Sequence, residues 1–136
     1  MKVRVREFGT MPTKVHETDA GWDLYAPEGF TVPAQGFSSR INLGVGFEIP
    51  VGYAGFVIER SSQGKKGLVS VGPVVDHGYT GDVHLTLCNN SNEEVVYEKG
   101  DRVAQLVVSC ISTEALEQAD ELEGERGNNG HGSSGR

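Results

Sequence analysis

Short segments in which apolar and polar residues alternate recur along this 136-residue chain, each bounded by turn-forming residues. Alternation with a period of two is typical of a strand that buries one face. It is clearest over residues 82–89, where Val83, Leu85 and Leu87 point to one side of the strand. The segments predicted to form strands of this kind are 2–8, 22–26, 41–49, 53–59 and 82–89.

One further segment, residues 102–111, is apolar on both faces except at Gln105 and Ser109. This pattern predicts a central strand that is covered on both sides. Turn signals stand at 50–53 and 89–92, and the 19 glycines are about twice the usual share of ~7%. About eight strands at this spacing predict an all-β sandwich, barrel or jelly roll.

The length of 136 residues suits one domain with a single core. We find no internal repeat and no domain boundary before about residue 112, so residues 1–112 are predicted to form this domain. The composition of residues 114–123 favours a short helix. Its apolar positions would equally suit a strip that docks on another surface: Ala115, Leu116, Ala119 and Leu122.

Charge and cysteine content exclude several classes of protein. A net charge of −7 argues against a protein that tracks along nucleic acid. No apolar run is long enough to cross a membrane, and residues 1–7 alternate like a strand instead of forming a signal-peptide core. Cys88 and Cys110 lack metal-ligand spacing and lie in strand-like surroundings, which predicts buried free thiols and a cytosolic protein.

The glycine-rich end, residues 126–136, has four glycines in eleven positions. Ordering such a segment costs roughly 1–2 kcal/mol per residue, so we do not expect it to hold a structure by itself. It nevertheless carries an arginine, a ring and two adjacent hydroxyls, which are groups suited to gripping an anion. A plain linker or disordered end is the alternative interpretation.

Five segments combine charged or hydroxyl side chains with glycine, and each lies at a strand end or turn. They are residues 20–24 (AGWDL), 59–68 (ERSSQGKKGL), 72–82 (GPVVDHGYTGD), 100–106 (GDRVAQL) and the end segment 126–136. Taken singly, each is an ordinary turn, loop or strand entrance. Together and in this order, they resemble the five motifs of the trimeric dUTP pyrophosphatases, the dUTPases.

The resemblance covers nearly the whole chain. It implies a β jelly-roll fold, a homotrimer with three shared active sites, and a cytoplasmic enzyme that uses Mg²⁺ to split dUTP into dUMP and pyrophosphate. Such an enzyme limits uracil incorporation into DNA and supplies dUMP for dTMP synthesis. It further implies that residues 113–125 form an arm that crosses to a neighbouring subunit, and that residues 126–136 form a lid over that subunit's site.

Within the third motif, Asp76 matches the carboxylate that orients and activates the attacking water. Tyr79 matches the ring that packs under the deoxyribose, where a ribose 2′-hydroxyl would collide. The segment 70–76, with Ser70, Gly72 and Val75, is expected to form a hairpin that reads uracil through backbone groups and excludes the thymine methyl group.

The other motifs supply phosphate contacts. Arg60, Ser61 and Ser62 match the phosphate-binding segment that an adjoining subunit provides, and Gln105 matches the polar side chain of the fourth motif. Asp23 is expected to support the water and metal network, with a purely structural turn residue as the alternative. No carboxylate cage is visible, so Mg²⁺ should be held through the triphosphate and its own waters.

In the lid, the resemblance assigns nucleotide contacts to Arg126, His131, Gly132, Ser133 and Ser134. The chain departs from the family's pattern at three positions, two of which affect the details of base recognition. His131 stands where a phenylalanine usually stacks on uracil, and Pro73 stands where glycine is common, which removes one backbone donor. Glu59 stands where proline is frequent.

Two other functions compete with this interpretation. A dCTP deaminase shares the fold and parts of the motifs, but it needs a glutamate where this chain has Thr86, which cannot act as a carboxylate base. A nucleotide-binding regulatory trimer is the second alternative. The presence of Asp76 in a complete third motif argues against binding as the sole function.

Overall fold

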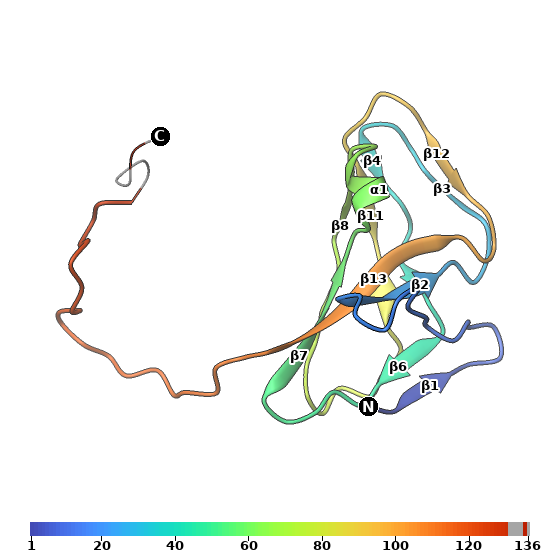
Figure 1. Ribbon diagram of the computed structural model, residues 1–136. Coiled ribbons are helices and arrows are strands. Elements are labelled where there is room, and N and C mark those ends of the chain that lie inside the picture. Colours follow the sequence, from blue (N-terminus) through green and yellow to red (C-terminus); the bar gives the residue numbers. More distant parts are fainter. Residues whose placement is uncertain (131–134, 136) are drawn as a thin grey trace.

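The computed structural model describes residues 1–130 and 135, and strands dominate this part of the chain (Figure 1). The prediction of an all-β fold is confirmed. The elements are β1 (Val3–Val5), β2 (Gly21–Tyr25), β3 (Phe30–Val32), β4 (Gly36–Phe37), β5 (Ile41–Asn42), β6 (Val45–Phe47), β7 (Tyr53–Ile58), α1 (Ser61–Gly64), β8 (Leu68–Ser70), β9 (Val74–Val75), β10 (His84–Leu85), β11 (Leu87–Asn89), β12 (Val95–Tyr97) and β13 (Arg102–Cys110).

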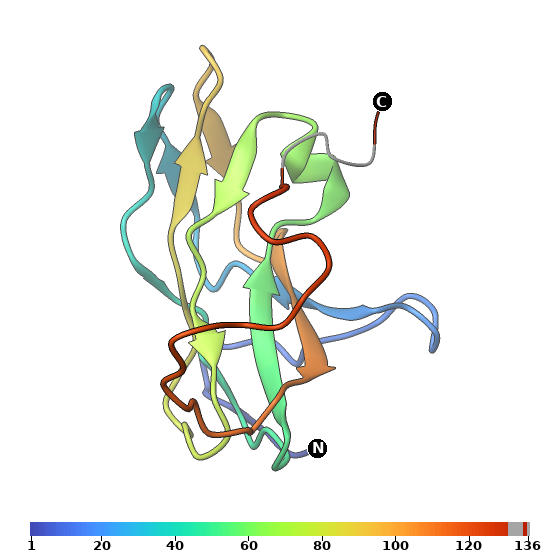
Figure 2. The ribbon, with the colours of Figure 1, turned by 90° about the vertical axis from the view of Figure 1, so that its left-hand side faces the viewer.

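The largest sheet has four strands in the order β2-β13-β7-β9, and β13 pairs antiparallel with both of its neighbours. A second sheet has the order β4-β11-β8, and three two-stranded ladders, β1-β6, β5-β10 and β3-β12, complete the body. Seen from the two directions of Figures 1 and 2, these strands surround one interior. A single cluster of buried apolar side chains fills that interior.

The alternation over residues 82–89 is confirmed, because Val83, Leu85 and Leu87 are all buried. The segment 41–49 forms two strands, β5 and β6, instead of the one predicted. Gly44 separates them with a φ of +68°. A side chain at this position would meet Gly9 and the ring of Phe8, so the local turn depends on glycine.

Strand β13 is central in its sheet, as predicted, but it is not covered along its whole length. Val103, Ala104 and Leu106 are buried, whereas the strand's last residues, Ser109 and Cys110, are exposed. The prediction of buried thiols is therefore wrong for Cys110, and Cys88 is only partly buried. Both cysteines are free thiols, as expected.

Beyond β13, every residue from 111 to 130 is exposed, and Figure 1 shows this segment running away from the body. Residues 114–123 form no helix, so that interpretation is wrong; a short isolated helix without a packing partner is unstable in water. The leucines of this segment, Leu116 and Leu122, are 103% and 90% exposed. The boundaries predicted at residues 112 and 125 remain predictions.

Within the described residues, no helix is long and apolar enough to cross a membrane.

A cluster of charged side chains, which we call the Asp82 cluster, ties the N-terminal strand to the body. Asp82 accepts hydrogen bonds from Arg4 Nη2 at 2.7 Å, Arg6 Nε at 3.1 Å and Asn42 Nδ2 at 3.1 Å. The Arg4 hydrogen bond, followed by that of Asn42 and the contacts with Arg6, lowers the pKa of Asp82 from 3.8 to about 2, although burial opposes the shift.

Because its folded-state pKa lies below the unfolded value, Asp82 should stabilise the fold above about pH 4, and this contribution should disappear as the pH falls towards about 2. We expect Asp82→Asn to lower the free energy of unfolding at neutral pH by about 1–2 kcal/mol, a figure reduced for the solvent exposure of both arginines. Urea titrations of both proteins at about pH 6.5 and about pH 2.5 would check this. An equal difference at both pH values would contradict it.

Candidate active site

The third motif lines a cleft of about 430 Å³, together with Arg40, His84 and Thr86. The segment 70–76 is not the paired hairpin that the sequence predicted. Strand β8 pairs with β11, whereas β9 pairs with β7, so the chain crosses from one sheet to the other here. Gly72 permits this crossing, because a Cβ atom there would lie 2.3 Å from the carbonyl oxygen of Val57.

Asp76 and Tyr79 both line this cleft. Asp76 follows β9 directly and is exposed, and within the described residues its carboxylate makes no hydrogen bond. A turn joins the two residues: the Tyr79 N–H donates to the Asp76 carbonyl at 3.2 Å, and Gly78 between them has a φ of +88°. The Val75 side chain is buried beneath the segment, so Val75 contributes only backbone groups to the cleft.

A second pocket, of about 230 Å³, collects the first, second and fourth motifs. Asp23, Arg60, Ser61 and Gln105 all line it. Among the described residues, this pocket shares no lining residue with the Asp76 cleft, so there one chain does not bring the two groups of predicted residues together.

Asp23 is the electrostatic centre of the second pocket. Its largely buried carboxylate is 2.7 Å from Arg60 Nε and 3.1 Å from Arg102 Nη1. Asp23 lies within β2 and not in a turn, and its ion pairs with two arginines are compatible with the alternative of a structural role. Sequence reasoning missed Arg102; its place in the fourth motif, three residues before Gln105, was the available signal.

Gln105 lies opposite Asp23 across the β2–β13 ladder. Its Nε2 donates to the carbonyl oxygen of Glu59 at 3.1 Å. The Glu59 carboxylate in turn accepts the Ser70 N–H at 3.3 Å, and the Ser70 hydroxyl donates to Val57. A hydrogen bond therefore joins Glu59, the first residue of the second motif, to Ser70 just before the third motif, although the two motifs line separate pockets.

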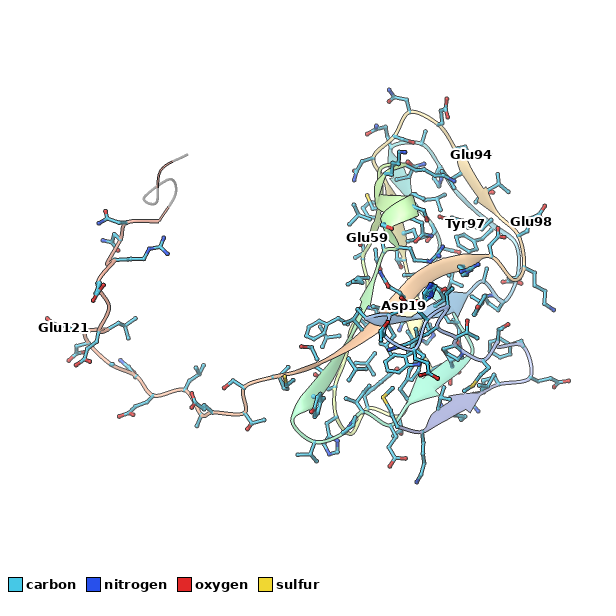
Figure 3. All side chains as sticks on the ribbon, viewed as in Figure 1. Asp19, Glu59, Glu94, Tyr97, Glu98 and Glu121 are labelled. Carbon is cyan, nitrogen blue, oxygen red and sulfur yellow. The ribbon has the colours of Figure 1, made fainter. Side chains whose placement is uncertain are left out.

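Arg60 directly precedes helix α1, and Ser61 and Ser62 form its exposed first turn. The buried Gln63 holds this turn in place, and sequence reasoning missed it. Its Oε1 accepts the Arg60 N–H at 3.1 Å, and its Nε2 donates to the Tyr97 hydroxyl at 2.9 Å. Burial raises the pKa of Tyr97, which stays a neutral partner. Figure 3 labels Tyr97 and Glu59 in this region.

The predicted lid is described only in part. Arg126 is exposed, and its Nη2 donates to the Asn129 carbonyl at 3.3 Å. The other predicted contacts, His131, Gly132, Ser133 and Ser134, lie outside the described residues.

The described residues contain no group of three or more His, Cys, Asp or Glu side chains able to hold a metal ion. Asp23 is engaged by two arginines, whereas the Asp76 carboxylate is exposed. This donor set fits an ion that binds mainly to a ligand's own oxygens, the preference of Mg²⁺.

The dUTPase family model matches residues 7–135. This chain belongs to the dUTPase family. It is 39% identical to the deoxyuridine 5'-triphosphate nucleotidohydrolase of Saccharomyces cerevisiae, over 99% of this chain and 94% of the relative. The family assignment predicted from the five motifs is confirmed.

Solved dUTPases show the same fold. The dUTPase of Staphylococcus bacteriophage 80alpha with dUPNHPP has a TM-score of 0.85 at 31% identity, over 99% of this chain and 98% of that one. A variant of the phage phi11 dUTPase of S. aureus, which coordinates a structural Mg(II) ion, has a TM-score of 0.78 at 29% identity, over 88% and 96%. The jelly-roll dUTPase fold is thus confirmed, and the deaminase alternative is not favoured.

The Gln63–Tyr97 pair yields a prediction for this dUTPase. Gln63→Leu should leave the buried Tyr97 hydroxyl without its partner and destabilise the fold by about 1–3 kcal/mol. Adding Tyr97→Phe removes both polar groups and should restore much of that loss. Urea unfolding of the two single variants and the double variant would measure the coupling. Strictly additive losses would show that the pair contributes nothing specific.

Proposed function

We infer that this chain is a dUTP pyrophosphatase, which hydrolyses dUTP at the α-phosphorus to dUMP and pyrophosphate. The observation that carries this function is the third motif, in which Asp76 and Tyr79 line one cleft of a dUTPase fold. The reaction limits uracil incorporation into DNA and supplies dUMP for dTMP synthesis. The two free thiols favour the cytoplasm as its location.

In the proposed reaction, Asp76 orients a water molecule in line with the bond that breaks. The water oxygen bonds to the α-phosphorus as the carboxylate takes its proton, and pyrophosphate leaves. The exposed carboxylate fits this role, because within the described residues no cation or donor competes for it. A positioned base of this kind contributes about 10²–10⁴-fold to the rate.

Substrate recognition divides between the two pockets. In the cleft, backbone groups around Gly72 and Val75 are proposed to read uracil, and the Tyr79 ring to support the deoxyribose. In the second pocket, Arg60 with Ser61 and Ser62 is proposed to bind phosphate oxygens. Arg60 is oriented for this by Asp23, since the Asp23 ion pair fixes the guanidinium that forks towards phosphate.

Magnesium is proposed to arrive with the triphosphate. Bound to phosphate oxygens, the ion would neutralise charge that develops as pyrophosphate leaves. Asp76 and Asp23 are the carboxylates that would meet its water shell.

We propose that the enzyme is a homotrimer in which each site combines residues from neighbouring subunits. Support comes from the two pockets, which a single chain keeps apart although one nucleotide needs both sets of groups. The exposed Leu116 and Leu122 support an arm, residues 113–125, that docks on another subunit. Residues 126–136 would then form a lid over that subunit's site, with Arg126 near the phosphates.

An assay of pyrophosphate release from dUTP, dCTP, dTTP and UTP tests the function directly. We expect activity with dUTP to exceed the others, and Asp76→Asn to lower turnover by about 10²–10⁴-fold while dUTP still binds. Glu28→Gln, an exposed change outside both pockets, serves as the control for expression and folding.

Two results would contradict these assignments. Wild-type turnover in Asp76→Asn would remove this residue from the mechanism. Nucleotide binding without any pyrophosphate release in the wild-type protein would instead favour the regulatory trimer.

Deletion of residues 126–136 tests the lid and the trimer together. Ordering about ten residues costs roughly 10–20 kcal/mol, so closure should depend on contacts with bound nucleotide. We expect the truncated protein to remain a trimer by light scattering and to lose most of its turnover. His131→Phe, with a larger stacking face, should lower KM modestly, and His131→Ala should raise it.

Full turnover after the deletion would show that residues 126–136 are a linker and not a lid. A stable and fully active monomer would exclude sites shared between subunits.

A further inference from the structure

The Asp82 cluster joins the last residue of the third motif to β1, a strand that none of the motifs includes. While its carboxylate binds Arg4, Arg6 and Asn42, the backbone carbonyl of Asp82 accepts a hydrogen bond from the Tyr79 hydroxyl at 2.9 Å. Asp82 itself lines the cleft with Asp76 and Tyr79. An anchored residue thus connects the N-terminal strand to the ring proposed to support the sugar.

We propose that Asp82 is a positioning residue, which holds the Tyr79 ring in place and thereby sets the preference for deoxyribose over ribose. The proposal rests on the dUTP pyrophosphatase function above.

The first argument is that packing alone does not fix this ring. Tyr79 is 46% exposed, and its hydroxyl makes the side chain's one hydrogen bond within the described part of the chain. The ring lies over Gly81, where a Cβ atom would come within 2.6 Å of the ring carbon that bears the hydroxyl. The position of the ring therefore depends on where the loop places the Asp82 carbonyl.

The second argument is that Asp82 is held from separate elements. Arg4 and Arg6 come from β1 and the residue after it, and Asn42 comes from β5. Gly46 in β6 leaves room for the Arg4 side chain to reach Asp82, since a Cβ atom at position 46 would lie 2.7 Å from both Arg4 Nη2 and the Gly81 carbonyl oxygen. Charge-assisted hydrogen bonds of this kind are shorter and stronger than neutral ones.

The third argument concerns discrimination between sugars. A ring rejects a 2′-hydroxyl by steric contact only if it cannot shift away. Loss of the anchor should therefore admit UTP more than it harms dUTP. If Asp82 only attached the N-terminal strand to the body, its loss would instead affect both substrates equally.

The experiment compares kcat/KM for dUTP and UTP in wild type, Asp82→Asn and Arg4→Gln. We expect the ratio of kcat/KM for dUTP to that for UTP to fall about three- to tenfold in Asp82→Asn, the size of effect expected from one lost hydrogen-bonded anchor. The fall should be smaller in Arg4→Gln, because this variant leaves Arg6 and Asn42 in place. The control is Glu48→Gln, which breaks the exposed Lys2–Glu48 pair beside β1 without touching Asp82. Its ratio should stay at the wild-type value.

Tyr79→Phe provides the second measurement, because it keeps the ring and removes the hydroxyl. Its ratio should fall by a similar factor, and adding Asp82→Asn should lower it little further. An unchanged ratio, an equal loss for both substrates, or fully additive effects would overturn the proposal. Absence of dUTP hydrolysis in the wild-type enzyme would refute the function itself, a result separate from these. If Asp82→Asn does not fold, Arg4→Gln and Tyr79→Phe decide the question.

Discussion

The ion pairs of Asp23 are the interaction on which the proposed phosphate-binding side of this dUTPase depends. One carboxylate in β2 contacts Arg60 before α1 and Arg102 at the start of β13, so three distant segments meet at a single charge. Removing such a carboxylate would leave two neighbouring guanidinium groups to repel each other. Arg60, Arg102 and Asp23 together carry a net positive charge. This local charge suits an anionic ligand in a chain whose net charge is −7.

A second network supports the side that is proposed to bind the base and the sugar. The Asp82 cluster anchors the end of the third motif, and the crossing at Gly72 sets where that motif begins. The Glu59 carboxylate accepts a hydrogen bond from the Ser70 N–H, and this bond connects the segment before the third motif to the segment before Arg60. Both sides are therefore rigidly supported within one chain, yet they open into separate pockets. This separation supports the proposal that one nucleotide binds between neighbouring subunits.

Much of the fold could be predicted from local pattern, because alternation reports directly on which face of a strand is buried. This worked for Val83, Leu85 and Leu87, whose neighbours alternate without interruption. It failed where tertiary structure decides. The exposure of Cys110 depends on how far β13 extends beyond the body, and Gln63 is buried only because Tyr97, far along the chain, supplies its partner. The motifs singled out Arg60 and Asp76 as candidates, but they could not reveal that Asp23 and Gln63 position Arg60.

Glycine illustrates the same division between local and tertiary information. The high glycine content predicts many turns, and Gly78, with a positive φ, fits that prediction. Gly46, Gly72 and Gly81 serve another purpose: each allows backbone or a side chain to approach closer than a Cβ atom permits. These three lie around the third motif, where substitution by alanine would displace an arginine, a carbonyl or the Tyr79 ring. Glycines at 124 and 130 meet nothing within 4 Å, so there the residue contributes only chain freedom, whereas Gly127 adopts a φ of +48° that favours glycine.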